Sequence, residues 1–315
     1  MGLKELHRKR LINLEDVAPY VSTWDTTKIS TGSSGNNQIK LPLPNLSGSI
    51  YNFTVDWGDN TSNIITSYNQ AEITHTYTIE GVYTLEITGV CVGFGFDNQE
   101  DKLKLKSISS WGCLQFITSY GFGTFHGCSN LVLSTVTDTP DLSKTNNDLS
   151  SLFRGCSSLV DINNSNFWDV SLVTKFLLTF SGCSNFNSDL SLWNMSSATT
   201  VQSMFNSASK FNRNIGNWDV SNIVDMYATF SNATSFNQDI SDWNVSELTG
   251  ANSFFKNTAF STANLDLVYQ KWSTRSVQSG VSINFGSTKY TSAGQAGRDI
   301  LTGTFGWTIT DGGLI

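Results

Sequence analysis

The three histidines, His7, His75 and His126, are the first residues to consider for catalysis, because a nucleophilic triad or a zinc site is usually built around histidine. Three histidines so far apart give neither a triad nor a metal cluster. His126 also stands at a variable position of a repeat, where the next copies have Arg154 and Ser181. We therefore predict no histidine-based catalysis, no bound metal and no cofactor.

Acidic residues and cysteines offer no better catalytic candidates. Asp189 and Asp239 share a repeat position with Asn214, whereas catalysis by paired carboxylates needs one specially placed acid. The cysteines number five and form no C-x-x-C pair, which argues against a metal site. We predict that the chain is not an enzyme. Calcium at the Asp/Asn turns is the alternative that these residues leave open.

The cysteines also have a structural explanation. Cys128, Cys156 and Cys183 occupy a repeat position that later copies fill with Ala208 and Ala233. Alanine replaces cysteine there, and identical positions in a stack usually point the same way, which disfavours a disulfide. We predict that these three thiols are small buried core residues.

The elements that position these residues repeat every 25 residues. Four tryptophans recur at that interval, each followed by Asp or Asn, then Val or Met, then Ser: Trp168, Trp193, Trp218 and Trp243. A fixed period of this length indicates stacked units that bury their apolar faces against one another. We predict a buried tryptophan column; a row of exposed rings that binds sugar is the alternative.

Each unit contains two different apolar patterns. After Ser171, Ser196, Ser221 and Ser246, apolar residues follow at helical spacing, including the core candidates Phe180, Phe205 and Phe230, so a helix with serine as its N-cap is predicted. L-x-x-L-x-L patterns predict short parallel strands over Leu190–Met195, Ile215–Val220 and Ile240–Val245. Asn187, Asn212 and Asn237 are placed to form an amide ladder between coils.

Two repeat signatures resemble a known family. F-x-G-C-S-x-L/F occurs at Phe125, Phe153 and Phe180, and the segment from Phe211 to Met226 reads F-N-x-x-I-x-x-W-D-V-S-N-x-x-D-M. Both are similar to the BspA-like leucine-rich repeats of bacterial and phage surface proteins, over about residues 100–265. The resemblance implies an α/β leucine-rich-repeat solenoid.

The preceding region has an all-β composition with frequent turn residues. Trp57-Gly-Asp-Asn60, His75-Thr-Tyr77 and Gly81-Val-Tyr83 resemble the pattern of a PKD domain, although the first turn is shortened. The resemblance implies an immunoglobulin-like β-sandwich, with His75 at a structural position.

The predicted fold is therefore a mostly β, Ig/PKD-like sandwich followed by an α/β leucine-rich-repeat solenoid with a C-terminal cap. The boundaries are an N-terminal docking arm at 1–17, the sandwich at 18–97, the repeats at 98–264 and the cap at 265–315. Helices over Leu265–Trp272 and Ser292–Leu301 are predicted in the cap. A net charge of −7 disfavours nucleic-acid binding, and no apolar run is long enough to span a membrane.

The candidate ligand-binding face consists of the outward positions beside the tryptophans, which change from coil to coil while the frame stays constant. They are Asn166, Phe167, Asp169, Ser191, Leu192, Asn194, Asn217, Asp219, Asp242 and Asn244. Solvent-exposed residues that vary without any role in binding would give the same pattern. We expect this face to bind a host-surface glycan or a protein.

The N-terminal segment has no secretory signal pattern, which favours a phage virion component over an exported bacterial cell-surface adhesin, the alternative. Its apolar and basic side chains would contact other virion proteins as an assembly arm: Leu3, Leu6, Arg8, Lys9, Arg10, Leu11 and Leu14. A loose leader is the other reading of this segment. A homo-oligomer is compatible with either setting.

Overall fold

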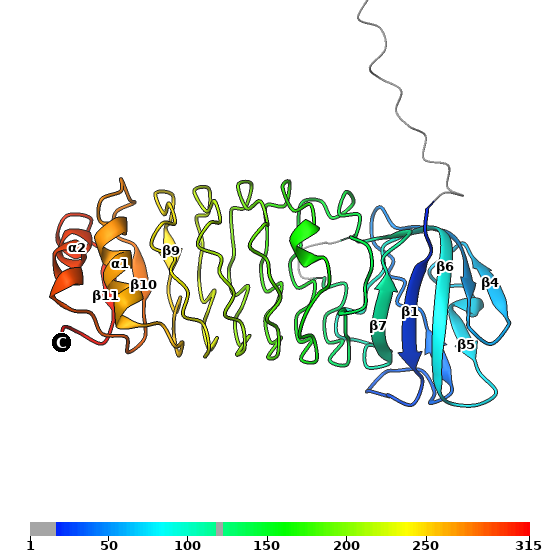
Figure 1. The fold of residues 1–315 in the computed structure, drawn as a ribbon. Helices are drawn as coiled ribbons and strands as arrows, with labels where there is room; N and C mark the ends of the chain where they lie inside the picture. The colour runs from blue at the N-terminus through cyan, green and yellow to red at the C-terminus, as the bar shows by residue number, and fades with distance from the viewer. Residues whose placement is uncertain (1–16, 118–121) are drawn as a thin grey trace, which may run out of the picture.

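The computed structural model describes residues 17–117 and 122–315 of the chain. Figure 1 shows a β-sheet region, a row of turn-rich coils and two helices, arranged in that order along one axis. The predicted arm lies outside the described residues, apart from Val17.

One six-stranded sheet dominates the N-terminal region. Its strands follow the order β4-β3-β6-β1-β7 with antiparallel pairing, and β8 pairs with the end of β6 in parallel. The strands are β1 (Tyr20–Asp25), β3 (Ile50–Asp56), β4 (Ser62–Ile65), β6 (Val82–Val92), β7 (Leu105–Ser110) and β8 (Leu114–Gln115). Alternate residues of β3 are buried, including Phe53 and Val55, as expected for a strand with one face on a core.

The predicted immunoglobulin-like sandwich is wrong. Outside the six-stranded sheet, the described part of this region has only β2 (Gln38–Lys40) and β5 (Thr74–Thr76), a pair of three-residue strands, and a 3-10 turn at Ala71–Ile73. Two such short strands cannot form the second face of a sandwich. Large aromatic side chains fill the core instead, and the Tyr77 hydroxyl donates to the carbonyl of Trp57 at 2.9 Å.

The coils continue from the edge of this sheet. Ser107 in β7 pairs in parallel with Val132, and Leu133 pairs with Ile162. A second parallel ladder then joins one residue of each coil, through Asp148, Lys175, Thr200, Asp225 and Gly250. Gly250 belongs to β9 (Gly250–Ala251), which pairs with β10 (Ser282–Asn284), and β10 pairs with β11 (Thr308–Thr310), so the ladder extends into the cap.

The predicted leucine-rich-repeat solenoid is also wrong, because the coils contain neither its strands nor its helices. Residues 190–195, 215–220 and 240–245 form turns and extended links without strand pairing. The described coils hold no α-helix, and their one 3-10 turn is Ser165–Phe167. The expected helices fail because each of the four segments that follow Ser171, Ser196, Ser221 and Ser246 has two left-handed residues four apart, such as Leu178 and Gly182. No α-helix contains this backbone state.

Hydrogen bonds between coils replace those expected within helices and strands. The amides of Phe176, Leu178 and Phe180 donate to carbonyls of the next coil at 2.9–3.1 Å. The Asn ladder is confirmed, since Asn187 Oδ1 accepts from the amide of Asn212, and Asn212 Oδ1 from that of Asn237. Backbone groups are thus satisfied by the neighbouring coil.

Columns of aromatic rings fill the interior of the coils. Successive phenylalanine rings stack 5.4–5.8 Å apart from Phe125 to Phe285, passing through Phe153, Phe180, Phe205, Phe230 and Phe255. The four repeat tryptophans are buried beside this column. The five cysteines are free and buried, as predicted for Cys128, Cys156 and Cys183. Each coil therefore buries its apolar face against its neighbours.

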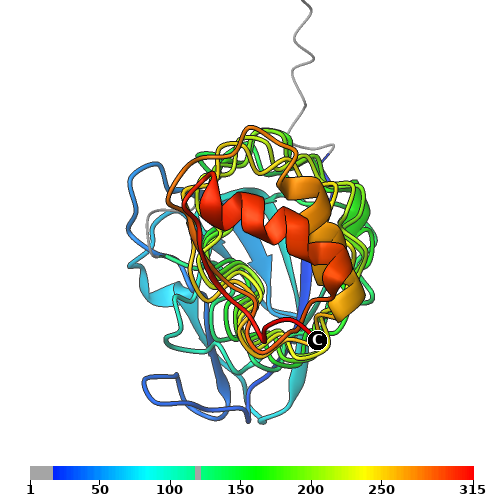
Figure 2. The same cartoon turned by 90° about the vertical axis from the view of Figure 1, so that its left-hand side faces the viewer.

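Two helices close the row, and both predictions for them are confirmed. Figure 2, which looks along the row, shows α1 (Thr262–Trp272) and α2 (Ser292–Gly303) lying across its end. Their N-caps are Ser261, which accepts from the amide of Asn264, and Thr291, which accepts from that of Ala293. Gly297 has its Cα against the carbonyl of Tyr269, where a Cβ would lie 2.2 Å from the oxygen, so the helices pack closely there.

Candidate functional site

The predicted ligand-binding face lies on the outside of the coils, where all ten of its residues are at least partly exposed. They follow each other at intervals of 25 residues, with coil-to-coil hydrogen bonds beneath them. The structure brings these residues into columns, and their contacts divide them into three groups.

The first group holds turns. Asp169, Asn194, Asp219 and Asn244 occupy one column, and the Oδ1 atom of each accepts from the amide two residues on at 3.1–3.3 Å. Asp and Asn form this Asx turn equally well, which explains their exchange along the column. The hydrogen bonds from Ser171 and Ser221 hold the pKa values of Asp169 and Asp219 below the usual range.

The second group joins neighbouring coils. Asn166 Nδ2 donates to Asp189 Oδ2 at 2.7 Å, and Asn166 Oδ1 accepts from the amide of Leu192 at 3.1 Å. Asn217 Nδ2 donates to the carbonyl of Ser191 at 2.8 Å. Asp242 forms an ion pair of 2.8 Å with Lys271 of the cap. These side chains fix the spacing of the coils and are not free to bind a ligand without losing those bonds.

The third group consists of two apolar side chains that neither hold a turn nor join neighbouring coils. Phe167 is 70% exposed and Leu192 is 63% exposed, and the Asn166–Leu192 hydrogen bond holds their two turns side by side. The same column continues with Asn217 and Asp242. We call Phe167 and Leu192 the apolar pair. It is the part of the predicted face with side chains available to a partner.

Sequence reasoning missed Leu172, which is 70% exposed one turn further along the coil. Its column continues with Ser197, Asn222 and Glu247, so a leucine there stands out once the repeat is aligned. It lines a groove of about 280 Å³ between the 140–147 loop and its own coil. That groove could not be found from the sequence, because the loop departs from the 25-residue period.

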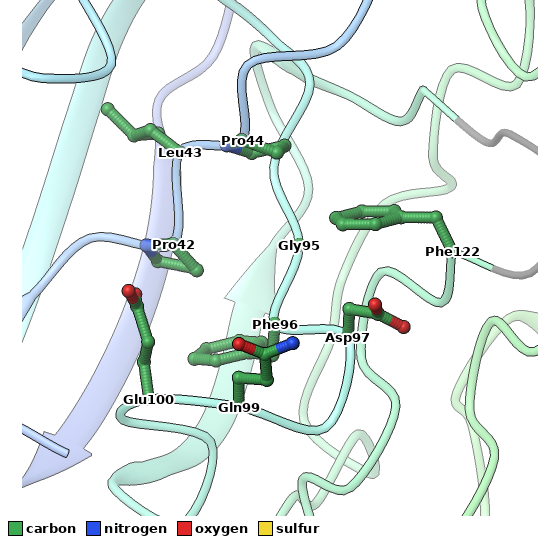
Figure 3. A pocket seen from close by; sticks show the side chains of 9 residues that line it. All are labelled: Pro42, Leu43, Pro44, Gly95, Phe96, Asp97, Gln99, Glu100 and Phe122. Carbon is green, nitrogen blue, oxygen red and sulfur yellow. The ribbon is translucent and has the colours of Figure 1, made fainter. Parts of the chain in front are cut away.

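A second hollow lies where the sheet region meets the first coil. Figure 3 shows the ring of Phe122 pointing toward Gly95, with Phe96 and Asp97 below it and the Pro42–Pro44 segment on the other side of the hollow. Its volume is about 160 Å³. Of its two carboxylates, Glu100 is paired with Lys40 at 2.6 Å, and Asp97 Oδ1 lies 3.7 Å from His126 Nδ1. This hollow is too small and too internally paired to be a strong ligand site.

Each of the two described histidines lies beside an aspartate side chain. His75 stacks on Trp57, with ring centroids 4.8 Å apart, and its Nε2 lies 2.8 Å from Asp59 Oδ2. His126 Nδ1 lies 3.7 Å from Asp97 Oδ1. Burial and the nearby Arg154 lower the pKa of His126, although Asp97 opposes them. Among the described residues, no group of three or more His, Cys, Asp or Glu side chains could hold a metal ion.

The remaining predicted residues are placed as follows. Trp168, Trp193, Trp218, Trp243, Phe180, Phe205 and Phe230 are in the core. The assembly-arm residues Leu3, Leu6, Arg8, Lys9, Arg10, Leu11 and Leu14 lie outside the described residues. In the described ranges, no helix has both the length and the apolar character needed to cross a lipid bilayer.

The Asx turns predict an acid-dependent stability. Because the folded-state pKa values of Asp169 and Asp219 are depressed, their contribution is complete above the unfolded value of 3.8 and is lost as pH falls through the lower folded values. The double variant Asp169→Asn/Asp219→Asn keeps both turns, since Asn194 and Asn244 already form them. We expect urea unfolding to show a modestly lower stability than the natural chain at about pH 6, where both natural carboxylates are ionised and hydrogen-bonded, and a smaller loss between about pH 6 and pH 3. An unchanged pH dependence would contradict the assignment.

A comparison with known protein families matches part of the chain. Neither a leucine-rich-repeat model nor a PKD model matches the chain, so both predicted family resemblances are wrong. No curated protein and no solved structure matches it. The family model that does match is described as "Mycoplasma protein of unknown function, DUF285", over residues 147–272. The similarity thus runs from the coil after the 140–147 loop to the end of α1 and includes the whole candidate face.

Proposed function

We propose that this protein is a non-enzymatic recognition protein, displayed on a surface, whose stacked coils present the apolar pair to a protein partner. The observation that carries the proposal is the exposure of Phe167 and Leu192 side by side, in a column that is otherwise polar. Adjacent exposed apolar side chains on a rigid frame are typical of interaction sites. The hydrogen bonds between coils supply the rigidity without help from a ligand.

A protein partner is favoured over a glycan by the chemistry of the exposed groups. Sugar-binding platforms use exposed aromatic rings, whereas the tryptophan rings of this repeat are 2–5% exposed. The apolar pair has one aromatic ring and one branched aliphatic side chain, which fit an apolar side chain of a protein better than a hydroxylated ring.

The setting that we propose is the surface of a phage particle, with a bacterial cell surface as the alternative. A surface with few charges, rich in Ser, Thr and Asn, suits either. Mass spectrometry of purified particles, compared with surface labelling of intact cells, separates the two. Recovery of the chain from washed cells of a phage-free culture, and from no particle, would contradict the phage setting.

The apolar pair itself is tested by a double variant that copies its own column. Phe167→Asn/Leu192→Asn places the side chain of Asn217 in the two preceding coils, so the fold should be retained. We expect attachment of the labelled protein to its target surface, particle or cell, to weaken about tenfold or more, as for loss of central interface residues.

The matched control is Val224→Thr. It removes another exposed apolar side chain, 41% exposed, and its column already has Thr174, Thr199 and Thr249. Attachment of this control should be normal. Equal attachment of the double variant and the control would contradict the proposal.

A further inference from the structure

The groove beside Leu172 has the features of a side-chain binding site. It has a volume of about 280 Å³ and lies between the 140–147 loop and the Asp169–Val173 turn. Leu142, Leu172 and Val173 provide apolar surface, and Asp141 and Asp169 provide carboxylates. The volume is just below the range of about 300–1,000 Å³ typical of small-molecule sites. It accommodates one or two amino-acid side chains.

Both walls of the groove are fixed before any ligand arrives. The loop is held at one end by Asp141, which accepts from the amide of Ser143 at 2.9 Å and from the side chain of Gln115. At its other end the carbonyl of Asn147 accepts from the amide of Thr174 at 2.8 Å. The groove is therefore preorganised, which lowers the entropic cost of binding.

The groove is negatively charged at neutral pH. Hydrogen bonds from Ser143 and Gln115 keep the pKa of Asp141 below its usual range, although partial burial opposes them. Both hydrogen bonds of Asp169 go to Oδ1, from the amide and hydroxyl of Ser171, which leaves Oδ2 for a partner. Lys144 does not line the groove, although its positive charge contributes to the lowered pKa of Asp141. Apolar surface between two carboxylates suits an apolar side chain next to a basic one.

We propose that this groove binds a segment of a partner protein in which a leucine-like side chain lies next to Lys or Arg. The apolar side chain packs on Leu142, Leu172 and Val173, and the cation pairs with Asp169 Oδ2 or Asp141. This inference rests on the proposed recognition function and names the chemistry of its partner. The groove lies on the same coil as Phe167, five residues further along the chain.

The experiment is a selection of random peptides displayed on phage against the full chain, followed by fluorescence polarisation with a selected peptide. We expect enrichment of Leu or Ile next to Lys or Arg. Leu172→Ser, which copies Ser197 of the next coil, should weaken binding about tenfold or more, and Asp169→Asn should weaken it about threefold to tenfold with reduced salt dependence. A peptide with Glu in place of Lys and Arg should not bind.

The matched control is Asp219→Asn, which changes the same column and the same Asx turn two coils away. It should leave binding unchanged. Equal loss in Asp169→Asn and Asp219→Asn, binding of the charge-reversed peptide, or no enrichment of basic and apolar residues would each overturn the groove assignment. Equally tight binding of a peptide of residues 3–14 would replace the partner by the chain's own N-terminal segment, the one basic cluster of the sequence.

The two proposals fail separately. If Leu172→Ser and Asp169→Asn leave peptide binding unchanged while Phe167→Asn/Leu192→Asn abolishes attachment to the particle or cell, the groove assignment is wrong and the recognition face stands. If the groove variants lose peptide binding while the apolar-pair variant attaches normally, the groove stands and the proposed role of the apolar pair is wrong.

Discussion

Replacement of Lys104 by methionine should destabilise the protein by about 3–5 kcal/mol, the usual result of leaving one charge of a buried pair without its partner. The Lys104 ammonium and the Asp101 carboxylate are fully buried and 3.3 Å apart. The ammonium also donates to the carbonyls of Ser34, Gly35 and Gln38 at 2.8–3.1 Å. Methionine fills a similar volume but leaves those carbonyls, and the carboxylate, without their cation.

The same pair anchors a long loop to the sheet. Asp101 accepts from the amides of Ser34 and Lys40, both at 2.7 Å, and the Lys104 carbonyl accepts from the amide of Asp25 in β1 at 2.8 Å. Loss of the ammonium therefore loosens the loop between β1 and β2 as well as exposing an unpaired charge. Urea unfolding followed by circular dichroism measures the loss.

The control for Lys104 is Lys40→Met. Lys40 pairs with Glu100 at 2.6 Å, but the two side chains are 38% and 34% exposed. A pair so accessible to water should contribute about 0–1 kcal/mol. Lys104→Met/Asp101→Asn should recover part of the loss, because it removes the buried charge that the single variant leaves. A Lys104→Met variant as stable as Lys40→Met would contradict this account.

The period of the repeat could be read from the sequence, and so could the register of its residues. Trp193 and Phe205 recur at 25-residue intervals with their neighbours, and the structure has both inside the coil. The Asn ladder and the two cap helices were also predictable, because an amide at a turn and a capped amphipathic segment have local causes.

The secondary structure of the coils could not be predicted, because two different backbones share one apolar spacing. Val173, Phe176 and Phe180 have the intervals of a helix, but Leu178 between them is left-handed with φ near 59°. Ser203, Ala228 and Ser253 repeat that state in the following coils. Serine, alanine and leucine carry no signal for a left-handed residue, unlike glycine, so the helical interpretation was wrong.

The candidate site likewise has one part that could be predicted from the sequence and one part that could not. The exposure of Phe167 and Leu192 follows from register, because both stand next to a buried tryptophan. The groove depends on where the 140–147 loop returns, which no period describes. What these surfaces bind stays a prediction. The Asx role of Asp169 could have been recognised from its column, where Asn alternates with Asp and a serine follows two residues on.

Replacement of Phe205 by alanine should cost about 3–5 kcal/mol, the range for large-to-small changes of a buried aromatic residue. Its ring is fully buried, lies 5.7 Å from that of Phe180 and 5.6 Å from that of Phe230, and stacks 3.9 Å from Phe211 of its own coil. Removal of the ring interrupts the column in the middle. Neighbouring coils cannot collapse into the gap, because hydrogen bonds between backbones fix their spacing.

Cys156→Ala is the control for a buried change that the frame accepts. Cys156 is fully buried, and its Sγ donates to the carbonyl of Phe125 at 3.1 Å, but the equivalent positions in later coils are Ala208 and Ala233. We expect a loss of about 1 kcal/mol or less in the same urea titration. If Cys156→Ala unfolded the protein, or if Phe205→Ala cost no more than Cys156→Ala, the aromatic column would not be the main source of coil-to-coil stability. The two results together distinguish an aromatic ring that stabilises the stack of coils from a buried thiol that alanine can replace.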